Sequence, residues 1–180
     1  MLEQNSNEPL LDMFIFETTQ LIEQLENSIL TNEKSSCYTQ SAINEIFRIM
    51  HTIKGSSAMM MFENISSLAH VIEDLFYFIR EEKPRDIDCS VLSDLILEGV
   101  DFIKAEIDKI KNGDAADGEA SGLISKIKDF LSILEQNNPP SSIKKVKEYN
   151  SDVKQQYYIS PEKVKNPMPD RVYKVVVYFE

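Results

Sequence analysis

The sequence predicts an all-α protein, an up-and-down bundle of about five helices. Apolar residues recur every three or four positions over five successive stretches, which is the period of an amphipathic helix. Only 5 of the 180 residues are glycine and none is tryptophan, a composition that favours helices over a turn-rich β fold. Hydrophobic residues make up 42% of the chain, which is enough for the core of one domain with an appendage.

The first two helices are expected between residues 10 and 53. Apolar residues of the first recur over residues 10–29, where Asn7 can cap the helix and Pro9 suits its first turn. The second pattern begins near Cys37, and its apolar positions continue to Ile53. Each pattern places its apolar side chains on one stripe, so each helix needs a neighbour that covers this stripe.

Three further helices are expected over residues 65–79, 92–110 and 123–134, by the same period. A polar cap, a proline or a glycine marks the ends of the third and fourth helices, namely Asn64, Pro84, Asp88 and Gly113. Five one-sided helices joined by short loops must bury their stripes against one another. A helical bundle is the simplest arrangement that does so.

The end of the chain differs from the rest. The segment "QNNPPSS" ends the last helix and begins a polar stretch, so we expect a bundle over residues 1–137 and a flexible linker over 138–170. Residues 171–180, "RVYKVVVYFE", are β-branched and aromatic and predict one isolated C-terminal strand. Because a single strand is not stable alone, we interpret it as the first strand of a truncated following domain. Pairing with another molecule is the alternative.

Charge and motifs exclude several classes of function. The net charge of −11 disfavours nucleic acid and anionic lipid as partners. No apolar run approaches the roughly 18 residues of a membrane span, and no secretory signal is recognisable, so we expect a cytoplasmic protein without membrane insertion. No glycine-rich phosphate loop is present, so nucleotide binding is not expected. Cys37 and Cys89 lack a CxxC spacing and are expected to be two separate thiols in a reducing compartment.

His51 is the first candidate for chemistry. With about 100° per residue it lies on the shoulder of the second helix's apolar stripe. Gly55 and Ala58 lie on the same face and leave the imidazole uncovered, while Arg48 and Lys54 flank it with positive charge. Glycine inside a helix costs about 0.5–1 kcal/mol relative to alanine, so we expect a partner to approach closely at Gly55.

Glu73 is the second candidate. It lies on the shoulder of the third helix, one turn after His70. If the second and third helices are antiparallel, Glu73 can reach His51. A carboxylate that accepts from one ring nitrogen fixes the tautomer and makes the other nitrogen more basic and more nucleophilic.

Two other interpretations of these residues stay open. His51 alone could be an ordinary boundary residue, since short motifs match by chance. His51, His70 and Glu73 could instead hold a metal ion, although the second Glu-x-x-His pair of bundle di-iron sites is missing. A serine or cysteine hydrolase is disfavoured because no histidine stands at motif spacing. Residues 59–62, "MMMF", are expected in the core and at the helix end, or, for Met59, in a docking contact.

The segment "IFRIMHTIKGSSAMMMFENISSLAHVIEDLF" resembles the phosphoacceptor motif of histidine-containing phosphotransfer (HPt) domains, most closely those of chemotaxis histidine kinases of the CheA type. The two histidines are 19 residues apart, as in the family. The residues that carry the resemblance are His51, Lys54, Gly55, Phe62, His70 and Glu73. The resemblance covers roughly residues 8–137 and implies a four-helix HPt core.

The resemblance implies phosphotransfer in a two-component chemotaxis pathway. His51 would accept a phosphoryl group from ATP bound to the kinase catalytic domain of the partner subunit, and would pass it to an aspartate of a CheY-like response regulator. Glu73 would orient His51, Lys54 would stabilise the transferred charge with Arg48 as a weaker candidate, and His70 would tune Glu73 or the phosphoryl group. The docking surface would comprise Arg48, Gly55, Ala58 and Met59.

By the same resemblance, this chain is one part of a histidine protein kinase. It would be phosphoacceptor and phosphodonor, with no cofactor of its own, because other domains or partners bind ATP and magnesium. The linker and final strand are similar to the start of a regulator-binding domain. The alternative is a non-catalytic helical interaction domain that has lost phosphotransfer.

Two positions differ from the family pattern. Ser56 takes the place of a second small residue after the glycine, which is a modest change. Many members have glycine immediately before the phenylalanine that ends the helix, where this chain has Met61. The expected left-handed end of the helix therefore lacks its usual residue.

Overall fold

The computed structural model describes residues 8–33 and 37–138. Within these ranges every regular element is an α-helix, which confirms the all-α fold class. The helices are α1 Glu8–Glu33, α2 Gln40–Met59, α3 Glu63–Glu82, α4 Cys89–Lys111 and α5 Ser121–Asn137. The expected cap Asn7, most of the linker and the strand over residues 171–180 lie outside the described residues.

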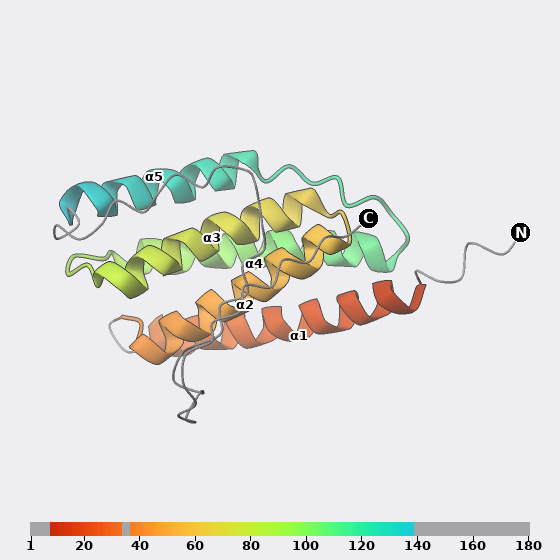
Figure 1. The fold of residues 1–180 in the computed structure, drawn as a ribbon, viewed down its shortest axis with the longest axis horizontal. Coiled ribbons are helices and arrows are strands. Elements are labelled where there is room, and N and C mark those ends of the chain that lie inside the picture. Colours follow the sequence, from red (N-terminus) through yellow and green to blue (C-terminus); the bar gives the residue numbers. More distant parts are fainter. Residues whose placement is uncertain (1–7, 34–36, 139–180) are drawn as a thin grey trace, which may run out of the picture. The chain divides into compact units, whose positions relative to one another are not determined.

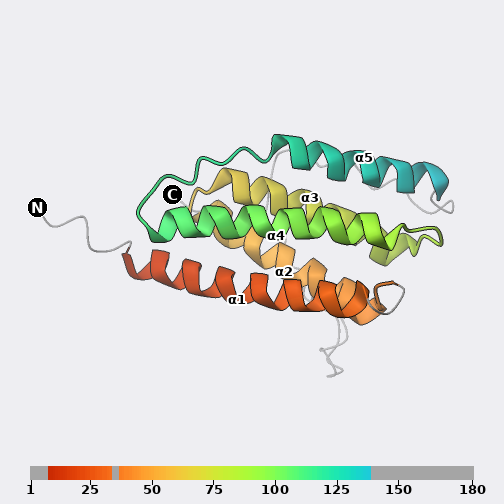
Figure 2. The ribbon, with the colours of Figure 1, turned by 180° about the vertical axis from the view of Figure 1, so that it is seen from behind.

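Helices α1 to α4 form the core of the bundle, and α5 lies along its outside (Figures 1 and 2). The α2–α3 pair has the most extensive interface, and α1 packs against both α2 and α4. Helix α5 packs mainly against α3 and less against α4. All five helices belong to one compact unit. Because α2 and α3 are consecutive and antiparallel, residues in the middle of each lie side by side.

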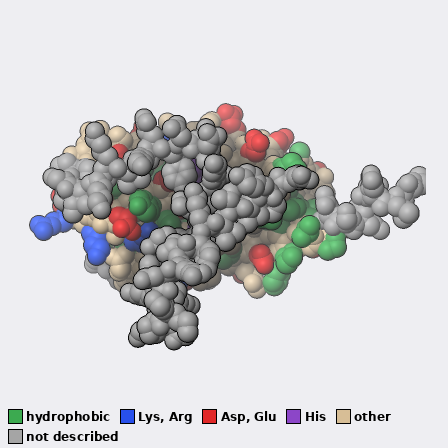
Figure 3. All heavy atoms as spheres, in the orientation of Figure 1, with side chains coloured by type: hydrophobic (Ala, Val, Ile, Leu, Met, Phe, Trp, Pro, Cys, Tyr) green, Lys and Arg blue, Asp and Glu red, His purple; other side chains and the backbone are tan. Residues whose placement is uncertain are grey.

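The core consists of the apolar stripes that the periodicity predicted. Met50 in α2, Ile72 in α3 and Ile96 in α4 are fully buried. Apolar side chains also remain on the surface, notably Leu10, Met13, Phe16 and others of α1 (Figure 3). No helix in the described part of the chain is long and apolar enough to cross a membrane.

Several helix ends follow the sequence prediction. Asp88 caps α4, and its carboxylate accepts from the backbone N–H groups of Ser90 and Val91. Helix α3 ends at Glu82, before Pro84, and Gly113 adopts a φ of 78° after α4. These ends match the expected effects of a polar cap, a proline and a glycine.

Two expected helix starts are wrong. Helix α2 begins at Gln40 rather than near Cys37, and the Thr39 side chain caps it by accepting from the Ala42 N–H. Asn64 does not cap α3, because it lies inside the helix and its Nδ2 donates to the Gly118 carbonyl at 2.6 Å. Asn64 thus holds the α4–α5 connection, where the backbone N–H of Gly118 also donates to the buried Glu106.

The end of α2 is left-handed although no glycine is present. Met61 has a φ of 61°, its N–H donates to the Ala58 carbonyl, and the Phe62 N–H donates to the Ser57 carbonyl. This pattern is a Schellman motif with methionine at the position that glycine usually occupies. Met59 and Met61 are each 84% exposed, so the expectation that they lie in the core is wrong. Phe62 packs against Phe14 at 5.2 Å between ring centroids.

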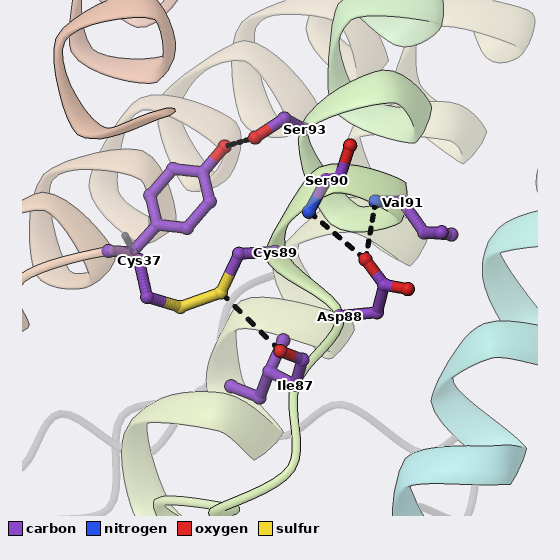
Figure 4. The surroundings of a disulfide bond; sticks show 8 residues. Cys37, Ile87, Asp88, Cys89, Ser90, Val91 and Ser93 are labelled. Atoms are coloured by element: carbon purple, nitrogen blue, oxygen red, sulfur yellow. Dashed lines mark hydrogen bonds between the residues drawn. A yellow bond between two sulfur atoms is a disulfide. The ribbon is translucent and has the colours of Figure 1, made fainter. Parts of the chain in front are cut away.

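The two cysteines are joined, which corrects the expectation of separate thiols. A disulfide links Cys37, in the segment before α2, to Cys89, the first residue of α4 (Figure 4). Their Cα atoms lie 5.5 Å apart although the residues are 52 positions apart in the sequence. The reason is topological, because the α1–α2 connection and the α3–α4 connection lie at the same end of the bundle (Figure 1).

Candidate functional site

His51 and Glu73 meet across the α2–α3 interface. The His51 Nδ1 atom lies 2.9 Å from Glu73 Oε1, the contact that the shoulder positions of both residues predicted. The His51 side chain is 64% exposed, whereas that of Glu73 is 9% exposed. The imidazole therefore stands at the surface, and the group that orients it is buried beneath it.

Glu73 also forms an ion pair with Lys54. Lys54 Nζ lies 2.7 Å from Glu73 Oε2, so the two carboxylate oxygens contact two different side chains of α2. Burial by itself would raise the pKa of Glu73, but the hydrogen bonds and positive charges of Lys54 and His51 outweigh this effect and hold the pKa below its usual value. Glu73 is therefore an ionised carboxylate at neutral pH.

The charge of Glu73 determines the state of the imidazole. An ionised carboxylate can only accept hydrogen bonds, so Nδ1 of His51 carries the hydrogen in this contact. In the neutral ring Nε2 then has the free electron pair. Because most of the side chain is exposed, this nitrogen can meet a group on another molecule.

The face of α2 around His51 is open. Gly55, Ala58 and Met59 are exposed, and a Cβ atom added at Gly55 would meet nothing within 4 Å. Nothing in the part of the chain that the structure describes thus requires glycine at position 55. Arg48 is exposed on the flank nearer α1, where it lines a surface groove with residues of both helices. All four residues of the expected docking surface are accessible.

An aromatic cluster on the α3 side of His51 was not predicted. The Phe47 ring lies nearly parallel to the His51 ring, with 6.2 Å between centroids. The Arg80 guanidinium lies 4.1 Å above the Phe47 ring and 5.3 Å from the Tyr77 ring. Phe47 is one of the apolar residues within the second helix that the periodicity predicts. Its position one turn before His51, on the same face, was the available signal.

His70 does not join this group. Its Nε2 faces Asp74 Oδ2 at 3.6 Å on the same helix, and both side chains are more than half exposed. The contact of His70 is thus with Asp74 rather than with Glu73, and its tuning of Glu73 or of the phosphoryl group stays a prediction. His51, His70 and Glu73 do not form the common metal site left open by the sequence. In residues 8–33 and 37–138, no group of three or more potential ligands could hold a metal ion.

Comparison with known proteins identifies similar sequences. A family model described as "Hpt domain" matches residues 9–113. The chemotaxis protein CheA of Treponema pallidum (strain Nichols) is 37% identical over 125 residues, which cover 69% of this chain and 15% of that protein. CheA of Borreliella burgdorferi is 38% identical over 130 residues, covering 72% of this chain and 15% of that protein. This chain therefore spans about 15% of the length of these relatives.

Two solved structures have the same fold. The solution structure of the histidine phosphotransfer domain of CheA has a TM-score of 0.61 and 30% identity, covering 68% of this chain and 92% of that chain. The phosphorylated P1 domain of CheA3, crystallised in complex with CheY6 from R. sphaeroides, has a TM-score of 0.61. Its identity is 19%, and the match covers 70% of this chain and 98% of that chain.

Proposed function

Because this chain belongs to the Hpt domain family, we propose that His51 is its phosphoacceptor and that the domain carries phosphoryl groups in a two-component chemotaxis pathway. The observation that carries the proposal is the exposed imidazole held at Nδ1 by a buried, ionised carboxylate. This arrangement fixes one tautomer and leaves Nε2 accessible as the nucleophile.

In the first transfer, the electron pair of Nε2 attacks the γ-phosphorus of ATP. A nitrogen–phosphorus bond forms, the bond from phosphorus to the bridging oxygen breaks, and ADP leaves with the electron pair. The phosphorylated ring carries positive charge while Nδ1 keeps its hydrogen. The Glu73 carboxylate stabilises this charge at 2.9 Å, where burial strengthens the interaction.

Lys54 has two tasks in this proposal. Its ion pair with Glu73 keeps that carboxylate ionised. The Lys54 side chain is 28% exposed, so its ammonium group can also turn toward the equatorial oxygens of the transferring phosphoryl group. Arg48, on the other flank, is the weaker candidate for the same electrostatic role.

In the second transfer, we propose that the phosphoryl group passes to an aspartate of a CheY-like response regulator. The nitrogen–phosphorus bond breaks and an acyl phosphate forms, with a magnesium ion bound by the regulator. Support comes from the similar P1 domain of CheA3, whose structure was determined with CheY6. The open face at Gly55, Ala58 and Met59 offers the necessary approach.

We assign the other functions of the kinase, such as ATP binding and regulator binding, to segments outside the helical bundle. ATP binds to a separate catalytic domain of the partner subunit, so this chain needs no cofactor of its own. Residues 138–170 are a linker, and residues 171–180 begin a regulator-binding domain. We place the protein in the cytoplasm, where ATP and response regulators occur.

The test is phosphate incorporation from radiolabelled ATP with a CheA kinase core. His51→Gln should abolish labelling and preserve the helical circular dichroism spectrum. His70→Gln is the matched control, since this second histidine is similarly exposed and contacts Asp74 instead of Glu73. Labelling that persists in His51→Gln, or an unlabelled wild-type chain, would exclude the assignment and favour a non-catalytic interaction domain.

A further inference from the structure

We propose that Cys37 and Cys89 form a redox modification site that reacts reversibly with low-molecular-weight disulfides such as glutathione disulfide. The bond joins the segment before α2 to the first residue of α4. The Cα separation of 5.5 Å lies within the usual range for disulfides, about 4.4–6.8 Å. The fold thus brings the two sulfurs together without displacement of either backbone.

Contacts beside the cysteines hold the same two segments together. The Tyr38 hydroxyl lies 2.7 Å from Ser93 Oγ, the contact drawn as a dashed line at Ser93 in Figure 4. The Tyr38 ring also packs edge-on against Phe76 of α3. Within the second segment, the Asp88 carboxylate accepts from the N–H groups of Ser90 and Val91 and so fixes the start of α4, where Cys89 lies. These contacts do not depend on the bond between the sulfurs. The thiols of the reduced protein therefore stay close, and the bond can form again.

Both cysteines are accessible to small reagents, since each is partly exposed. The 180 residues contain two cysteines, so each has one possible partner within the chain. At low protein concentration, the closeness of the two thiols favours the internal bond over a bond between two molecules.

The chemistry is thiol–disulfide exchange. One cysteine thiolate attacks a sulfur of the low-molecular-weight disulfide, which forms a mixed disulfide and releases one thiolate. The second cysteine thiolate then attacks the protein sulfur of the mixed disulfide and releases the other thiolate. The two cysteines lose two electrons, the reagent gains them as two thiols, and the protons of the cysteines pass to solvent or to the released thiolates.

The Cys37–Cys89 bond should change the stability of the folded bundle and not the position of the His51 imidazole. It links two residues that are 52 positions apart in the unfolded chain, which lowers the conformational entropy of the unfolded state. Helix α2 begins at Gln40, shortly after the disulfide, and His51 follows three turns later. Oxidation should therefore stabilise the bundle and leave the His51–Glu73 contact in place. This inference does not depend on phosphotransfer.

The experiment equilibrates the 180-residue chain in glutathione buffers of graded redox ratio and alkylates free thiols with N-ethylmaleimide. Intact mass counts the alkylated cysteines, and a non-reducing peptide map locates the bond. Thermal unfolding is measured at both ends of the series. We expect an internal Cys37–Cys89 bond under oxidation, two alkylated cysteines under reduction, and a Tm lower by about 10 °C in the reduced protein.

Cys37→Ser and Cys89→Ser are the paired controls. Each should remove the difference in Tm between oxidised and reduced buffer and should unfold near the temperature of the reduced wild type. Two alkylated cysteines at every ratio, or only glutathione adducts and covalent dimers, would overturn the site. An internal bond that leaves Tm unchanged would overturn the proposed stabilisation of the bundle by this disulfide.

Discussion

The His51 imidazole rests on the Glu73 carboxylate through a 2.9 Å contact, yet the two side chains differ in exposure, 64% against 9%. The imidazole faces solvent while its orienting partner lies between two helices. A helix pair produces this difference readily, because both residues stand on the shoulders of apolar stripes that face each other. The contact keeps Nδ1 occupied and leaves Nε2 available to a group on another molecule.

The charge of Glu73 can be tested with an isosteric change. Glu73→Gln keeps the shape and a hydrogen-bond acceptor but removes the negative charge that, in the proposed mechanism, stabilises the phosphorylated ring. We expect phosphorylation by a kinase core to slow by about 10- to 100-fold. Radiolabel incorporation at saturating kinase core measures the rate. Asp74→Asn, which neutralises the next carboxylate on α3, should change the rate little. An equal loss of phosphorylation rate in both variants would show that the effect comes from net charge and not from the contact with His51.

The pKa of Glu73 predicts a pH dependence of stability. Its folded-state pKa is lowered from the usual 4.5, so the ionised form favours the folded state. This contribution is fully present above about pH 4.5 and is lost as the pH falls through the folded-state pKa. Urea unfolding of wild type and Glu73→Gln should show a difference in free energy that shrinks below this pH. A difference that is constant from pH 7 to pH 3 would contradict the prediction.

Asp74 should show the opposite sign. Although the Asp74 side chain is more than half exposed, partial desolvation of its carboxyl raises its pKa from the usual 3.8, and the negative charge of Glu73 adds to this despite the opposing charge of His70. Its ionisation therefore opposes folding, and this cost appears as the pH rises above about 3.8. Asp74→Asn should gain stability relative to wild type between pH 3 and pH 6, measured by the same urea titrations. A relative loss of stability over this interval would show that the His70 contact dominates.

A substitution at Gly55 should change the stability of α2 and the rate of phosphoryl transfer in opposite directions. A Cβ at this position meets nothing within 4 Å, so Gly55→Ala should stabilise α2 by about 0.5–1 kcal/mol. The added methyl group projects one turn from His51 on the open face, and we expect slower phosphoryl transfer to a receiver. Gly122→Ala in α5 is the matched control, since this exposed glycine is equally open and lies on a helix outside the site. Urea unfolding measures the change in stability. The loss of radiolabel from the phosphorylated domain after addition of a CheY-like response regulator measures the rate of transfer. Equal transfer rates in both variants would remove Gly55 from the docking surface.

The periodicity of the sequence predicted the helices and the meeting of His51 with Glu73, because both depend on positions relative to one stripe. It failed where distant segments meet. Asn64 donates to Gly118, 54 residues away, and Cys37 pairs with Cys89. Arg80 reaches Phe47 from another helix. Spacing along one helix contains no information on such pairs, since they depend on how the connections lie in space.

Met61 offers a test of the helix end. Its φ of 61° is a left-handed conformation, which costs residues with a Cβ atom about 1–2 kcal/mol. The side chain is 84% exposed, so little packing is lost on its removal. Met61→Gly should therefore raise the free energy of unfolding by about 1 kcal/mol, offset in part by the greater freedom of glycine in the unfolded chain. Met61→Ala is the control, because it removes the same exposed side chain and keeps the Cβ atom. Chemical denaturation of both variants decides the point: equal stabilities would mean that the left-handed turn is not strained by its side chain.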